Sequence, residues 1–207
     1  MYHADVQADF SVECGADNEC LEIPWSSGDG LVRYADLRRQ PELIDSIEEA
    51  RNFPELREFL KMVNAPTSAL QSAKCDAWFT TELNAEEEIF GAPAKFGSYV
   101  DVIFADAASR SALSTHEHLA RDLVRLLARA PEMPAAAEFL IRRAWFHYPS
   151  AGRQPIEGFY LTCYVFGYGS DEEQSRKLWD IALKLFANAM VQISAKLRAA
   201  ETGQHQL

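Results

Sequence analysis

Two similar stretches decide the fold of this chain: AKCDAWFT at residues 73–80 and LIRRAWFH at residues 140–147. Each has the alternating pattern of a strand that is buried on one side, and each carries a Trp near its end. Each also follows an Ala-Pro pair, Ala65-Pro66 and Ala130-Pro131, and these pairs lie 65 positions apart. The fixed spacing predicts an internal repeat.

The segments after each Trp continue the repeat. A hairpin connection leads to a second strand, which opens at Gly97-Ser98-Tyr99 and at Gly158-Phe159-Tyr160, and a long helix follows each time. This order predicts an α+β fold with a mainly antiparallel sheet and helices packed on one face. We predict a single domain, residues 1–207, built from β-β-α units of about 65 residues each. The units lie at about 66–130 and 131–200, with a degenerate unit at about 1–65.

Side chains alternate across a strand, so each predicted strand can be divided into two faces. One face is almost wholly apolar, and we expect the helices to pack on it. Its residues are Ala73, Cys75, Ala77, Phe79, Val100, Val102, Phe104, Leu140, Arg142, Ala144, Phe146, Leu161, Cys163 and Val165.

The opposite face combines aromatic rings with ionisable groups. Trp and Tyr offer a large contact area at a low cost in side-chain entropy, and their polar ends can still form hydrogen bonds. The face therefore predicts a cleft for a small amphipathic or aromatic ligand, or an interface with a subunit or partner protein. The other interpretation is that the N-terminal unit, with Phe139 and Ile141, covers it as a second core layer. The predicted ligand-binding residues are Asp76, Trp78, Tyr99, Asp101, Arg143, Trp145, His147, Tyr160 and Tyr164.

The charge of the chain limits its partners. Its 207 residues include 31 acidic and 20 basic side chains, a net charge of −11. This excess argues against nucleic acid or an anionic membrane surface as the main partner, because phosphates bind clustered Lys and Arg. It leaves open an alternative function, an acidic protein-interaction module such as an inhibitor or chaperone for a basic partner.

The apolar runs and the cysteines indicate the compartment. No run approaches the roughly 20 apolar residues of a membrane helix, and no signal peptide is visible, so we predict a cytoplasmic protein that does not enter a membrane. The 4 cysteines are too few for a disulfide scaffold. Cys14 and Cys20 flank a turn that can bring them together, and whether they interact stays open.

Motifs of known chemistry are missing from the sequence. It contains no nucleophile elbow, P-loop, HExxH or CxxC. The two histidines of Thr115-His116-Glu117-His118 point in different directions on a helix, so we predict no metal site and no cofactor. An enzyme would have to use Asp76 and His147 as acid or base and Arg143 to hold a carboxylate substrate. A structural Arg143–Asp76 ion pair explains the same residues.

The last predicted helix, about residues 171–198, has two apolar stripes. A helix that is apolar over so much of its circumference is buried on two sides. It lies centrally in the fold, or its second face forms a homodimer. We therefore predict a binding protein rather than an enzyme, with its ligand on the face that carries Trp78 and Trp145.

Overall fold

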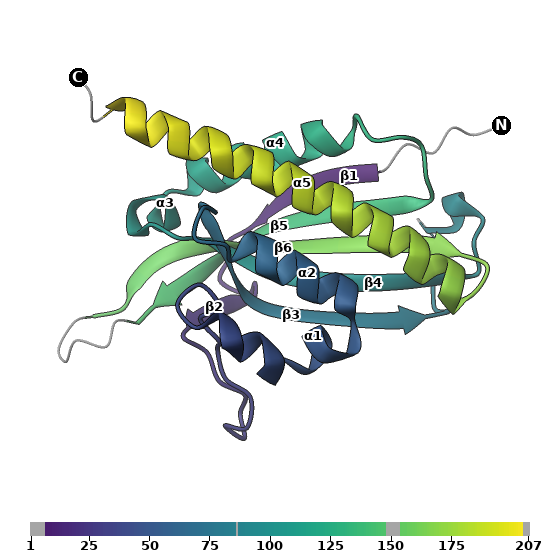
Figure 1. Cartoon of the computed structure of the whole chain (residues 1–207), viewed down its shortest axis with the longest axis horizontal. Helices are drawn as coiled ribbons and strands as arrows, with labels where there is room; N and C mark the ends of the chain where they lie inside the picture. The colour runs from purple at the N-terminus through teal and green to yellow at the C-terminus, as the bar shows by residue number, and fades with distance from the viewer. Residues whose placement is uncertain (1–6, 86, 148–153, 205–207) are drawn as a thin grey trace.

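A six-stranded sheet organises the chain, with its strands in the order β1-β5-β6-β4-β3 and β2 also paired with β5 (Figure 1). The computed structural model describes residues 7–85, 87–147 and 154–204. The strands are β1 (Gln7–Glu13), β2 (Cys20–Ile23), β3 (Leu70–Thr80), β4 (Ala94–Phe104), β5 (Ala135–Phe146) and β6 (Ile156–Gly169).

The sheet is mixed, so the prediction of a mainly antiparallel sheet is wrong. β3, β4, β6 and β5 form antiparallel neighbours, whereas β1 and β2 both run parallel to β5. In the described residues β1 and β2 do not pair with each other, so these two strands form no hairpin. The α+β class itself is confirmed. The order strand, strand, helix occurs three times in the described elements, after β1–β2, β3–β4 and β5–β6, but a repeat of the same unit stays a prediction.

The long helices lie together on one side of the sheet (Figure 1). They are α2 (Pro54–Val63), α4 (Leu113–Leu127) and α5 (Glu172–Gln204). The shorter helical segments are η1 (Pro41–Ser46), α1 (Glu48–Asn52), η2 (Glu87–Phe90) and α3 (Ala107–Ser111). No helix in the described ranges is long and apolar enough to cross a membrane.

The C-terminal helix α5 lies between α2 and α4 and contacts both, as well as β4 and β6 (Figure 1). Trp179, the largest fully buried side chain, points from α5 into the core, and its indole donates a hydrogen bond to the Ser98 hydroxyl over 2.8 Å. Most residues of its two apolar stripes are therefore buried within one chain, although Ile181 is 40% exposed. The central position explains most of both stripes, and the homodimer stays a prediction.

The orientation of β5 differs from the prediction. Ala135, Ala137, Phe139 and Ile141 belong to the core under the helices, so the opposite set, which includes Arg142 and Phe146, faces away from them. Phe139, Leu140 and Ile141 are all buried, so apolar side chains here do not reveal the inward face. Trp78 and Trp145 were both predicted on the face away from the helices, and the two rings lie on opposite sides of the sheet.

We call the side of the sheet away from α2, α4 and α5 the open face. One end of it carries a second apolar cluster, in which Leu21 and Ile23 of β2 and partly buried Trp25 and Tyr34 join the sheet. The N-terminal segment thus covers part of this face, as one of the three interpretations expected. The sheet residues of this cluster are Ala73, Ile103, Ala144, Phe146 and Tyr160. The residues that concern the site are Lys74, Asp76, Trp78, Lys95, Tyr99, Asp101, Tyr164 and Phe166.

Candidate functional site

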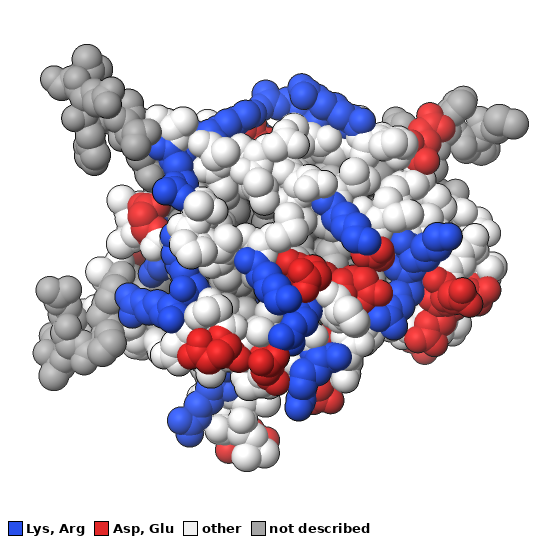
Figure 2. All heavy atoms as spheres, in the orientation of Figure 1, with Lys and Arg blue, Asp and Glu red and all other residues white. Residues whose placement is uncertain are grey.

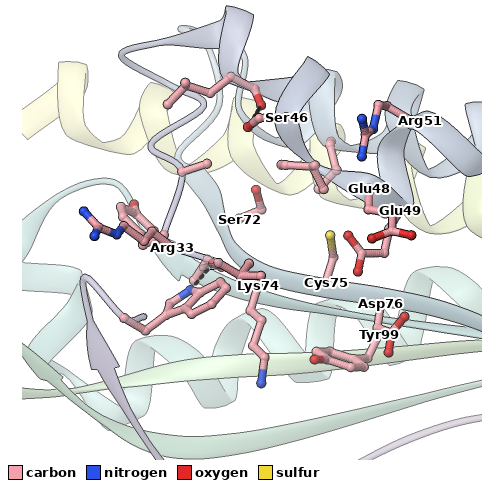
Figure 3. Close-up of a pocket in the computed structure, with 18 of the residues that line it drawn as sticks. Arg33, Ser46, Glu48, Glu49, Arg51, Ser72, Lys74, Cys75, Asp76 and Tyr99 are labelled. Atoms are coloured by element: carbon pink, nitrogen blue, oxygen red, sulfur yellow. Dashed lines mark hydrogen bonds between the residues drawn. The ribbon is translucent and has the colours of Figure 1, made fainter. Parts of the chain in front are cut away.

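A cleft of about 690 Å³ lies at the edge of the sheet along β3 (Figure 3). Its floor is formed by residues 72–76 of β3 and by Tyr99 of β4, one wall by the segment from Trp25 to Ala35, and the other by η1 and α1. Clefts that bind small molecules typically have about 300–1,000 Å³. The volume is therefore that of a small-molecule site.

The rim of the cleft carries unusually exposed apolar side chains. Leu31 is 84% exposed and Val32 is 58% exposed, more than any other large apolar side chain in the described residues. A tight turn presents them: Gly30 has a φ of 72°, and the Ser27 amide donates to the Val32 carbonyl over 2.8 Å. Left-handed backbone of this kind favours glycine. Isolated exposed apolar residues are common, but two at the mouth of a cleft offer contact to a ligand.

Aromatic rings and one lysine form the inner part of the cleft. The Trp25 indole donates to the Ala73 carbonyl over 2.6 Å, which fixes the ring against the free edge of β3. The Lys74 ammonium lies 5.9 Å from the centre of the Trp25 ring and 5.8 Å from that of Tyr99. In the described residues no carboxylate forms an ion pair with Lys74. Figure 3 shows acidic Glu48 and Glu49 on α1, in the wall of the cleft opposite the segment from Trp25 to Ala35.

Two of the side chains that line the cleft, Cys75 and Ser72, carry groups that can act as nucleophiles. Burial raises the pKa of the Cys75 thiol to about 12, so the thiol is protonated at neutral pH. The Ser72 hydroxyl accepts a hydrogen bond from the Asn64 side chain over 2.8 Å, and none of the described histidines lines the cleft. In the described residues no His, Cys, Asp and Glu side chains cluster in a way that could hold a metal ion.

An aromatic row continues from the cleft across the open face. Tyr99 lies 6.4 Å from Trp78 and 5.9 Å from Tyr164, and Phe166 lies 6.2 Å from Trp78 and 6.0 Å from Tyr164 (ring centres). All four rings are partly buried, so each keeps some contact with solvent. The Lys95 ammonium stands 5.1 Å from the centre of the Phe166 ring and is neutralised by Glu87 at 2.5 Å.

Gly97 makes room for this row. A Cβ at this position would lie 2.8 Å from the Phe166 ring and 3.2 Å from that of Trp78. The sequence analysis missed Phe166, Lys95 and the part played by Gly97. Phe166 follows Tyr164 by two positions, so simple alternation along the strand could have added it to the predicted face.

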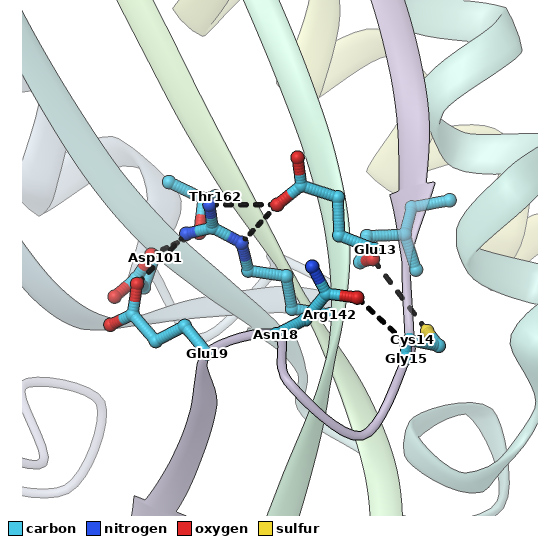
Figure 4. Close-up of polar contacts among 9 residues, drawn as sticks. Glu13, Cys14, Gly15, Asn18, Glu19, Asp101, Arg142 and Thr162 are labelled. Carbon is cyan, nitrogen blue, oxygen red and sulfur yellow. Dashed lines mark hydrogen bonds and ion pairs between the residues drawn. The ribbon is translucent and has the colours of Figure 1, made fainter.

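A polar network lies on the open face, in which Asp101 and Thr162 are buried and Glu19 is exposed (Figure 4). Arg142 donates to Glu13 over 2.9 Å and to Glu19 over 3.0 Å, so it holds both ends of the β1–β2 connection. The Thr162 hydroxyl donates to Asp101 over 2.7 Å. Burial raises the pKa of Asp101 to about 6, and the Thr162 hydrogen bond opposes this shift. Arg142, predicted to face the helices, is a structural residue of the opposite side.

The structure places the predicted site residues on both faces of the sheet. Asp76, Trp78, Tyr99, Asp101, Tyr160 and Tyr164 lie on the open face, where Tyr160 is fully buried. Arg143, Trp145 and His147 lie on the other face, next to the strand set that meets the helices.

The residues of the predicted enzyme therefore do not come together. Asp76 is on β3, whereas Arg143 and His147 are at β5, with β4 and β6 between them. Arg143 donates to the Gly15 carbonyl over 3.1 Å, and the His147 ring lies 3.3 Å from the Glu22 carboxylate. The predicted Arg143–Asp76 ion pair does not form.

Comparison of the chain with protein-family models, with curated proteins and with solved structures found no match.

Proposed function

We propose that the protein binds a small amphipathic or aromatic molecule in the cleft along β3 and does not transform it. One observation carries this proposal: the two most exposed large apolar side chains of the described chain, Leu31 and Val32, lie at the mouth of a cleft of about 690 Å³. Inside the cleft, aromatic rings surround an ammonium group. Such a gradient from apolar to charged fits an amphipathic molecule.

Each part of the cleft has a role in this binding. The apolar part of the ligand covers Leu31 and Val32, and its rings contact Trp25 and Tyr99. The Lys74 ammonium, which also interacts electrostatically with the Asp101 carboxylate, meets a polar or anionic end. A longer ligand reaches from Tyr99 to the partly buried rings of Trp78 and Phe166.

Titration with the amphipathic, anionic dye anilinonaphthalene sulfonate tests the proposal. Saturable dye fluorescence is expected for the wild type, with energy transfer from Trp25 and Trp78. The variant Val32→Ser removes apolar contact at the rim, and we expect its Kd to be about 5- to 10-fold higher. Stability should not change, because the side chain is exposed.

Val191→Ser is the matched control, since this valine is 47% exposed on α5, away from the cleft. Its Kd should equal that of the wild type. Equal Kd values for wild type, Val32→Ser and Lys74→Gln would contradict binding in this cleft.

An acidic interaction module is the second candidate, favoured by the net charge of −11 and by the exposed Leu31-Val32 tip. Figure 2 shows the helix side, where Lys and Arg are interspersed with Asp and Glu rather than separated from them. A partner attracted by net charge would dissociate as salt rises, because exposed charges are screened over about 8 Å at physiological ionic strength. Dye binding that is insensitive to salt but sensitive to Val32→Ser favours the cleft.

A further inference from the structure

The chain leaves the edge of β5 and returns to it at almost the same place. β1 pairs with β5 up to Glu13, which lies opposite Arg142, and β2 begins at Cys20, which lies opposite Arg143. Glu13 and Cys20 are thus neighbours in one interrupted row, and residues 14–19 form a loop between them (Figure 4). With ideal strand rise and the usual spacing of consecutive Cα atoms, this register corresponds to a separation of about 8 Å or less between the Cα atoms of Cys14 and Cys20.

Hydrogen bonds hold this loop closed. The Gly15 amide donates to the Asn18 side chain over 2.7 Å, and the Asn18 amide donates to the Gly15 carbonyl over 3.3 Å. At either end, Arg143 binds the Gly15 carbonyl and Arg142 binds Glu19. The turn therefore brings its two ends together before any covalent bond forms.

Alternation carried one residue past the end of β1 places the Cys14 thiol on the same side of the sheet as the Cys20 thiol. Cys20 shares the face of its partner Arg143, and Cys14 follows Glu13, which shares the opposite face with Arg142. The Cys14 thiol donates to the Ile141 carbonyl over 3.7 Å, so it points back toward β5. Each thiol also acts electrostatically on the same Arg143 guanidinium, and the charge of Cys20 contributes to the pKa of Cys14.

We propose that Cys14 and Cys20 are a disulfide-forming pair that closes the loop between β1 and β2 covalently. The oxidant is a low-molecular-weight disulfide. The thiolate of exposed Cys20 attacks it, forms a mixed disulfide and releases one thiol. The Cys14 thiolate then attacks the Cys20 sulfur and releases the second thiol. Two protein thiols and one external disulfide become one protein disulfide and two external thiols, so electrons and protons balance.

The geometry and the pKa values together predict how the reaction proceeds. Disulfides need Cα separations of about 4.4–6.8 Å, which fall within the limit set by the register. Burial raises the pKa of both thiols, while Arg143 opposes the shift. The reactive thiolate is therefore scarce at neutral pH, and closure should be several times faster at pH 9 than at pH 7.

The test compares the full chain in oxidised glutathione with the same protein under reducing conditions. Thiol titration in denaturant should fall from 4 groups to 2, and peptide mapping should place the new bond between Cys14 and Cys20. Closing the loop should raise the Tm by about 5 °C. Cys75→Ser is the matched control, in which the bond should form as in the wild type. Cys14→Ser and Cys20→Ser should each prevent it.

Three results would contradict the proposed disulfide. They are 4 remaining thiols after prolonged oxidation at pH 9, a glutathione adduct on Cys20 that does not resolve, or a bond that needs Cys75 or a second chain. Because dye binding in the cleft does not depend on these cysteines, the two proposals can fail separately.

Discussion

The two faces of the sheet are both rich in aromatic residues, yet only one of them is closed. On the helix side, Phe96, Phe186 and Trp179 are almost fully buried, and the one polar ring atom, the Trp179 indole nitrogen, has a hydrogen-bond partner. On the open face, Trp78, Tyr99 and Phe166 contact one another but remain partly exposed. The two faces therefore differ in whether other elements cover the aromatic rings, and not in which residues they contain.

Two glycines give the sharpest test of this difference. Gly167 of β6 faces α5, and a Cβ there would lie 2.1 Å from the Trp179 amide nitrogen and 2.5 Å from the Ser175 carbonyl oxygen. Because backbone cannot move aside as a side chain can, Gly167→Ala should cost about 4 kcal/mol or more of unfolding free energy.

Gly97→Ala is the open-face counterpart, where the added methyl meets only the rings of Phe166 and Trp78. These rings can rotate into solvent, so the expected loss is below about 1.5 kcal/mol, while dye binding near Tyr99 weakens. Urea denaturation of both variants measures the contrast. Equal losses would mean that the open face is as tightly packed as the helix side.

A buried acid on the open face gives the next largest effect. Burial raises the pKa of Asp101 to about 6, above the ordinary value of 3.8, so the folded state holds a proton that the unfolded state has lost. Stability from this group is therefore greatest below about pH 4 and falls as the pH rises through 6, by up to about 3 kcal/mol.

Asp101→Asn should remove this loss, because the amide oxygen can still accept the Thr162 hydrogen bond. We expect the variant to be about 1–3 kcal/mol more stable than the wild type at pH 7, with little difference at pH 4. Asp76→Asn, at an exposed position of the same face, should change stability by less than about 0.5 kcal/mol. A destabilised Asp101→Asn protein would show instead that the charge itself is needed near Arg142.

A buried histidine on the helix side has the opposite pH dependence. His116 packs against Phe104 at 4.9 Å and Phe159 at 5.8 Å (ring centres), and burial lowers its pKa below the ordinary 6.5. As the pH falls below 6.5, the unfolded state takes up a proton that the folded state resists, so stability falls by up to about 1.4 kcal/mol per pH unit. His116→Leu should remove this slope between pH 6.5 and 5. An unchanged slope would assign the acid sensitivity to other groups.

Alternation predicted the faces of β4, β6 and most of β3, but Ala73, predicted to face the helices, lies in the open-face cluster because the β3 register shifts between Ser72 and Lys74. Trp78 on β3, Tyr99 on β4 and Tyr164 on β6 lie on the open face, as their places in the alternating pattern predict. Polar and apolar residues alternate clearly around them. On β5 the run Phe139-Leu140-Ile141 is buried on both faces, so alternation does not show which face meets the helices.

The cleft could not be predicted from local pattern at all. The turn before Leu31 is evident in the sequence, but its position beside β3 depends on the path that residues 24–34 take across the open face. The parallel pairing of β1 and β2 with β5 is likewise a contact between distant parts of the chain. The pattern of residues within one strand does not show which other strand it pairs with.

Trp145 gives the smallest expected effect and tests the revised orientation of β5. It is 38% exposed, next to Glu157 of β6 and on the face opposite Trp78. Trp145→Phe should therefore change the unfolding free energy by less than about 0.5 kcal/mol and leave the Kd for the dye unchanged. Trp78→Phe should reduce energy transfer to the bound dye, because its ring contacts Tyr99 at the end of the cleft. If both substitutions weakened the dye signal equally, the two rings would share a site, and the assignment of Trp145 to the helix side of the sheet would be wrong.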